Sequence, residues 1–208
     1  MASKSKKVKL ITEVKSDMKT ADVKDFTQKF AMDDLTLKIE GKSLFVSKWV
    51  LSLVSPVFKK MLESDFKEGR SNEIELPGKS YASFYQFLKA IYPCGTDVTE
   101  ETVFDIFPLA EEYQITNLKV KCVNCMNKII GDKPSMENMF KILELICMYD
   151  MGDVITVDKC LDTMVPKINH VPTLKEFEAQ HNIPADVKVR LRDKIITAAF
   201  PHGFIMIR

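Results

Sequence analysis

Alternating apolar and polar residues predict short β-strands in the first part of the chain. Residues 35–39 alternate Leu, Leu and Ile with Thr and Lys, as in a strand with one buried face. Gly41 follows and favours a tight turn, so we expect residues 43–46 to return as the second strand of a hairpin. The same alternation predicts a third strand at 73–76. A hairpin alone is unstable in water, so these strands must pack against other elements.

Apolar residues spaced three to four apart predict helices around these strands. Ser55-Pro56 is a typical helix start, with Ser as the cap and Pro at the first helical position. Thr99 is expected to cap a later helix. The expected helices are 48–54, one from Pro56, 81–92, one from Thr99, and 116–128. Strands that open as a hairpin and are then mixed with helices favour an α+β fold over a doubly wound parallel sheet.

The chain divides by pattern into three parts. Residues 1–22 carry a lysine cluster and no apolar pattern, which is typical of a disordered basic tail; a nuclear-import signal or an acidic partner is the alternative. A domain is expected at 23–130. After the breaker Gly-Asp-Lys-Pro at 131–134, every apolar stripe has helical spacing, so residues 131–208 are expected to be an all-helical extension.

Composition and charge limit the possible partners. The 208 residues are 46% hydrophobic and carry a net charge of +1, which gives no electrostatic reason to expect nucleic acid or a membrane surface as a partner. No apolar run is long enough to span a bilayer, and the N-terminus lacks the apolar segment of a signal peptide. Without a secretion signal, the five scattered cysteines are expected to be reduced thiols. The chain is therefore expected to be intracellular, in the cytoplasm, the nucleus or both.

No catalytic or metal-binding motif stands out. Cys122 and Cys125 have C-x-x-C spacing, but a zinc site needs a second ligand pair and a redox site begins at a helix N-terminus. Both lie inside a helical pattern, so we interpret them as small core residues. The three histidines match no metal spacing, and no phosphate-binding or dinucleotide-binding motif is present. The chain is therefore not expected to be an enzyme, and it is expected to bind no cofactor and no metal.

Residues 33–128 resemble the BTB/POZ family. The resemblance rests on an ordered series of short matches, of which none is decisive alone: Asp34 to Lys48, Val50-Leu51, Ser55-Pro56-Val57-Phe58, Met61-Leu62, Asp65 to Glu68, Ile74-Glu75-Leu76, Phe84, Leu88, Ile91-Tyr92, Leu109-Ala110 and Tyr113. The resemblance implies a small sheet with a β-hairpin, flanked by helices. One departure is Ser47, where most members of the family have His.

At several of these matches, the residues are most similar to those of the MATH-BTB branch of the family. Glu-Gly-Lys at 40–42, Val-Ser-Lys at 46–48 and the segment 25–30 resemble that branch. The helical residues after 130 are similar to a shortened BACK region. The resemblance implies a protein-interaction module and no enzymatic activity.

The resemblance also implies a role as a cullin-3 adaptor in ubiquitin ligation. The family's cullin-binding signature is an apolar residue, any residue and then Glu, which matches Phe66-Lys67-Glu68, and Tyr92 is expected to join that contact. Phe66 would fill a pocket of the partner; the alternative is that it packs back onto its own core. The second candidate function is an oligomerisation scaffold without a ligase role, in transcriptional or cytoskeletal assembly.

A homodimer is the remaining expectation. Five apolar residues have no evident place in the core of one subunit and are expected to face a second copy, as in family members: Val23, Phe26, Phe30, Val50 and Leu53. Asp34 and Lys48 match a charged pair of the family near the dimer seam. An internal salt bridge that shapes the fold explains that pair equally well.

Overall fold

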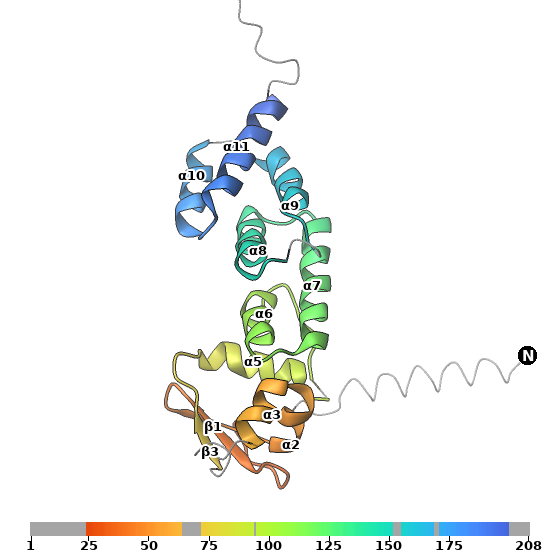
Figure 1. Cartoon of the computed structure of the whole chain (residues 1–208), viewed down its shortest axis with the longest axis vertical. Helices are drawn as coiled ribbons and strands as arrows, with labels where there is room; N and C mark the ends of the chain where they lie inside the picture. The colour runs from red at the N-terminus through yellow and green to blue at the C-terminus, as the bar shows by residue number, and fades with distance from the viewer. Residues whose placement is uncertain (1–23, 64–71, 94, 152–154, 169–170, 200–208) are drawn as a thin grey trace, which may run out of the picture. The chain divides into compact units, whose positions relative to one another are not determined.

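The computed structural model describes residues 24–63, 72–93, 95–151, 155–168 and 171–199 (Figure 1). Its contacts divide the chain into two compact units, Met1–Lys119 and Val120–Arg208. Val23, Phe66 and Glu68 lie outside the described residues. The predicted domain limits at 23, 130 and 131 stay predictions.

The first unit contains a three-stranded mixed sheet of order β2-β1-β3. Strand β1 (Leu35–Ile39) pairs antiparallel with β2 (Lys42–Val46) and parallel with β3 (Glu73–Glu75). The predicted hairpin is confirmed, and its turn has positive φ at both Glu40 (51°) and Gly41 (73°), as a two-residue turn of this twist requires. The buried residues of β1 alternate as its pattern predicts.

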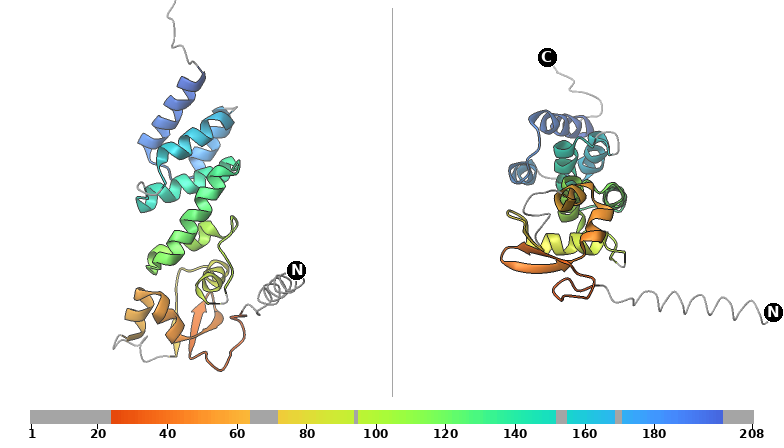
Figure 2. Two further views of the ribbon diagram at one scale, coloured as in Figure 1. Left: turned by 90° about the vertical axis from the view of Figure 1, so that its right-hand side faces the viewer. Right: turned by 60° about the horizontal axis from the view of Figure 1, so that its bottom comes forward.

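The other described regular elements of the first unit are helices. They are α2 (Lys48–Val54), α3 (Pro56–Glu63), α5 (Tyr81–Ile91), α6 (Val103–Glu112) and the start of α7 (Thr116–Gly131). Of these helices, α5 lies nearest the sheet and α6 packs on α5 (Figure 1). The views in Figures 1 and 2 agree that α5 lies beside the hairpin. The core of this unit includes Phe58 stacked on Tyr113, with ring centroids 4.3 Å apart.

Two helix starts test the capping predictions. The predicted cap at Ser55 is confirmed, because its Oγ accepts the Phe58 N–H at 3.1 Å. The start at Thr99 is wrong: α6 begins at Val103, one turn later. Thr99 instead opens a turn in which its N–H donates to Thr102 Oγ1 at 3.0 Å and its carbonyl accepts the Val103 N–H.

The described residues of the second unit are helical, as predicted. Beyond α7 they form α8 (Met136–Tyr149), α9 (Val157–Met164), the short 3-10 helix η2 (Val165–Lys167), α10 (Val171–Gln180) and α11 (Ala185–Ala199). Phe140 and Leu143 of α8 and Leu161 of α9 are fully buried. Ion pairs join α9 to α11, from Arg190 to Asp158 at 2.7 Å and from Lys194 to Asp162 at 2.6 Å.

Candidate functional site

Large apolar side chains gather on one part of the first unit. Among its described residues, the strongly exposed ones are Phe30 (50%), Met32 (82%), Trp49 (69%) and Leu53 (67%). Three of these four line one cavity, and the fourth lies one helical turn from Trp49. Contiguous exposed apolar surface of this kind marks interaction sites rather than ordinary solvent-facing surface. We call these four residues the apolar face.

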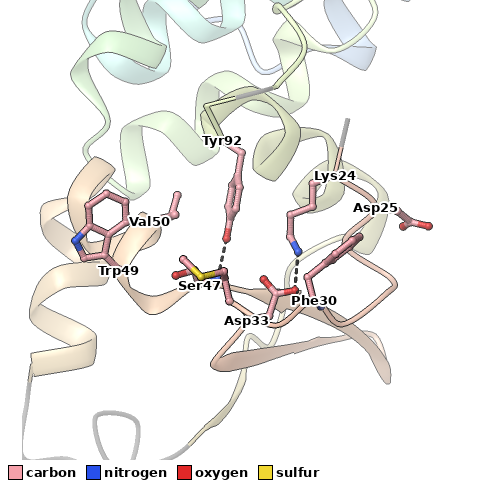
Figure 3. Close-up of a pocket in the computed structure, with 9 residues that line it drawn as sticks. Lys24, Asp25, Phe30, Asp33, Ser47, Trp49, Val50 and Tyr92 are labelled. Atoms are coloured by element: carbon pink, nitrogen blue, oxygen red, sulfur yellow. Dashed lines mark hydrogen bonds and ion pairs between the residues drawn. The ribbon is translucent and has the colours of Figure 1, made fainter. Parts of the chain in front are cut away.

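The cavity beside the apolar face has a volume of about 600 Å³. Figure 3 shows Trp49 and Val50 on one side, Lys24 and Phe30 on the other, and Tyr92 between them. The residues that line it are Lys24, Asp25, Phe30, Met32, Asp33, Ser47, Trp49, Val50 and Tyr92. They come from the segment before β1, the start of α2 and the end of α5, so segments distant in sequence assemble the site.

Three charged residues line the cavity, and two of them, Lys24 and Asp33, form an ion pair with each other; the third is Asp25. Asp33 has a side chain only 3% exposed, and its Oδ2 accepts from Lys24 Nζ at 2.6 Å and from the Phe30 N–H at 2.8 Å. Lys24 Nζ also lies 4.4 Å from the centroid of the Phe30 ring. Buried charges need such partners, and here the pairing fixes the loop that carries Phe30. The Lys24–Asp33 pair therefore adds no net charge of its own to the cavity wall.

Tyr92 forms the back of the cavity as a neutral phenol. Its hydroxyl oxygen accepts the Ser47 N–H at 2.8 Å, which ties the end of α5 to the start of α2. Burial is the main cause that raises the pKa of Tyr92 to about 12. The ring meets Phe26 edge-on at a centroid distance of 4.8 Å. At neutral pH this wall offers an aromatic surface and an uncharged polar tip.

A comparison with protein families decides the classification. The BTB/POZ domain model matches residues 23–130, which is more than half of the chain. This chain belongs to the BTB/POZ family. BTB domains are protein-interaction modules, so the apolar face and its cavity lie on a domain whose role is to bind other proteins.

The relatives of this BTB chain are larger proteins. It is 28% identical over 163 residues to the BTB and MATH domain-containing protein 38 of Caenorhabditis elegans, covering 78% of this chain and 40% of that protein. It is 32% identical over 117 residues to Kelch-like protein 40 of Xenopus tropicalis, covering 56% of this chain and 18% of that one. The chain thus spans less than half of these relatives' length. The expected likeness to the MATH-BTB branch agrees with the first of them.

A similar solved structure is the BTB domain of human Gigaxonin. The identity is 26%, the TM-score is 0.39, and the match covers 45% of this chain and 76% of that one.

Among the described residues, no helix is long and apolar enough to cross a membrane.

The residues predicted for the dimer seam separate into two groups. Phe26 is fully buried within a single BTB chain, so the premise that it lacks a place in the core is wrong. It packs edge-on against both Tyr85 and Tyr92. Phe30 and Val50 line the cavity, and Leu53 is 67% exposed, so these three remain available to a second copy.

Asp34 and Lys48, the charged pair of the BTB pattern, both make hydrogen bonds within the chain. Asp34 Oδ1 accepts the backbone N–H of Lys48 at 2.7 Å, which satisfies a free donor at the start of α2. Lys48 Nζ lies 3.1 Å from Asn72 Oδ1. These contacts shape the start of α2, and a role of either residue in a dimer stays a prediction.

Two contributors to the site are absent from the sequence predictions. Neither Trp49, which lies in the helix expected at 48–54, nor Met32 was among the residues predicted for a site. In the structure Leu51 is the buried residue of α2, which rotates Trp49 and Leu53 outward. The available signal was the excess of apolar residues in this seven-residue helix, because one buried face cannot hold them all.

Cys122 and Cys125, the pair with C-x-x-C spacing, both lie inside α7. Burial is the main cause that raises the pKa of Cys122 to about 12, so its thiol stays protonated inside α7, while Cys125 is half-buried. Across the described part of the chain, no three His, Cys, Asp or Glu side chains gather where they could hold a metal ion.

Proposed function

We propose that this chain is a non-catalytic, homodimeric adaptor that links a cullin-3 type ubiquitin-ligase scaffold to a substrate protein. The observation that supports dimerisation is the apolar face with its cavity. Four large apolar side chains exposed together on one face are costly in water, and burying each contributes about 1.5–3 kcal/mol. A second copy of the chain is the partner that family membership favours.

The expected result for assembly is a reversible dimer. Sedimentation equilibrium over a dilution series should give twice the mass of the 23.8 kDa chain at high concentration and a shift toward monomer on dilution. Leu53→Glu should move that equilibrium to monomer, because it places a charge within the apolar face. A wild-type chain that stays monomeric at every concentration contradicts the proposed dimer.

The cullin contact is proposed at Phe66, Glu68 and Tyr92. Phe66 and Glu68 lie outside the described residues, so their support is the family signature Phe66-Lys67-Glu68. Tyr92 accepts a hydrogen bond from the Ser47 N–H, lines the cavity and is half-buried, so part of it is open to a partner. The alternative function, an oligomerisation scaffold without a ligase role, needs the dimer but not this contact.

Phe66→Ala is expected to weaken binding to the N-terminal domain of a cullin-3 type scaffold about 30-fold, since truncating a central anchor costs about 2 kcal/mol. Glu68→Ala should weaken it less, because a rim charge acts mainly on the association rate. Calorimetry measures both affinities, and the melting temperature should be unchanged. A wild-type chain that does not bind, together with a sharp fall in melting temperature for Phe66→Ala, would favour the scaffold function.

A further inference from the structure

Helix α11 of the second unit turns apolar side chains outward as well as inward. Its buried residues are Val187 and Leu191. Val189 and Ile196, each 53% exposed, lie about 140–180° around the helix axis from that buried pair, at 3.6 residues per turn. They are separated by seven residues, so they line up along one side of the helix. We call Val189 and Ile196 the α11 strip.

Charged contacts hold α11 by its two flanks and leave the strip uncovered. On one flank, Arg190 and Lys194 pair with acidic residues of α9. On the other flank, Lys188 Nζ donates to the Glu178 carbonyl of α10 at 3.0 Å, and Arg192 pairs with the Glu178 carboxylate. Since both flanks are tied to α9 and α10, the strip lies on the side that neither helix covers.

Negative charge borders the strip. Asp186 and Asp193 are exposed and lie within about 60° of Val189 around the helix axis. Within the described part of the chain, neither carboxylate forms an ion pair, whereas the basic residues of α11 already bind α9 and α10. The strip and its border therefore suit an occupant that is apolar and carries a positive charge at one end.

The sequence that follows α11 has this chemistry. Residues 200–208, which lie outside the described residues, read Phe-Pro-His-Gly-Phe-Ile-Met-Ile-Arg. Pro201 and Gly203 are residues that favour a turn. The four residues 204–207 are all apolar, and the basic Arg208 comes next.

We propose that residues 204–208 turn back along α11 and cover its strip, with Phe204 beside Ile196 and Ile207 beside Val189. The lengths agree. Seven residues of helix place Ile196 and Val189 about 10.5 Å apart along the axis. The three steps of an extended chain from Phe204 to Ile207 cover about 10 Å.

Charge and covalent linkage favour this occupant over a separate molecule. With Ile207 beside Val189, Arg208 comes to Asp186, which lies one turn before Val189. Residues 200–203 are a short tether between α11 and the occupant, so the contact forms at the high effective concentration of an intramolecular event. A second copy of the chain would have to displace this tethered segment.

Photo-crosslinking in the full chain tests the contact and its direction. Phe204→p-benzoylphenylalanine keeps an aromatic group at this position and should cross-link to α11 at or next to Ile196. Ile207→p-benzoylphenylalanine should cross-link at or next to Val189. Mass spectrometry of the digested protein locates each link. Mixing isotopically labelled with unlabelled chains distinguishes links within one chain from links between copies.

Ile196→Asp should disrupt the contact, because it places a charge within the strip. The yield of the link from position 204 should fall about tenfold. Val189→Asp is the second variant and should lower the yield from position 207 in the same way. Met148→Asp, at a 57% exposed apolar residue of α8, is the matched control and should leave both yields unchanged. All three positions are exposed, so melting temperatures should stay near that of wild type.

Each outcome decides the proposal. Links within one chain, in the predicted order and lost in Ile196→Asp, support it. Links between differently labelled chains overturn it, because a second copy then covers the strip. Links to another part of the chain, no links at all, or yields that Ile196→Asp leaves unchanged also overturn it. The test does not depend on the proposed dimer or cullin contact, since both involve residues of the first unit.

Discussion

Phe26→Ala is expected to lower the free energy of unfolding by about 3–5 kcal/mol, the cost of truncating a phenylalanine in a packed core. Phe26 is fully buried, with ring centroids 5.8 Å from Tyr85 and 4.8 Å from Tyr92, both edge-on. Its carbonyl accepts the Phe45 N–H at 2.8 Å, which holds the segment before β1 against β2. Urea unfolding measures the loss.

Phe30→Ala is the matched control, because it removes the same side chain four residues later from a site that is 50% exposed. It should cost only about 1 kcal/mol of stability, mainly the contact with Lys24 Nζ. It should instead weaken the dimer, so both variants are compared at several protein concentrations to separate folding from association. Equal stability losses for the two variants would show that Phe26 is not part of the core.

Local pattern was sufficient to predict the sheet and most helices. The alternation in 35–39 and the Gly at 41 predicted the hairpin, because strand period and turn conformation are set by neighbouring residues. The start of α6 was predicted one turn early because Thr99 and Thr102 are both residues that favour helix caps. Sequence alone does not show that Thr102 Oγ1 would bond the Thr99 N–H.

The candidate site was only partly predictable, because its contacts join distant segments. Phe26 was placed at the dimer seam, since nothing near it in sequence shows that Tyr85 and Tyr92 enclose it. The cavity could not be foreseen for the same reason: Lys24, Ser47 and Tyr92 come from three different segments. Phe30, Val50 and Leu53 were predicted for the seam because they had no evident place in the core of one subunit, and in the structure they line the cavity or are exposed.

Ser55→Ala is expected to destabilise the first unit by about 2–4 kcal/mol, which is more than a helix cap alone contributes. Ser55 is 1% exposed, and its hydroxyl makes two hydrogen bonds. Its Oγ accepts the Phe58 N–H at 3.1 Å, which caps α3, and donates to the Tyr113 carbonyl at 2.7 Å. Loss of the cap costs about 1 kcal/mol. The substitution also leaves the buried Tyr113 carbonyl without its hydrogen-bond donor, which costs about 1–3 kcal/mol more.

Ser80→Ala separates these two contributions. Ser80 caps α5 by accepting the Ser83 N–H at 3.4 Å in an exposed position, so this variant should lose only about 1 kcal/mol. The difference between the two variants then measures the bond from Ser55 to Tyr113, which joins the α2–α3 corner to the end of α6 across 58 residues of sequence. Denaturant unfolding of both variants gives that difference. If Ser55→Ala costs no more than Ser80→Ala, the hydroxyl serves only as a cap, and the stacking of Phe58 on Tyr113 suffices to hold the corner.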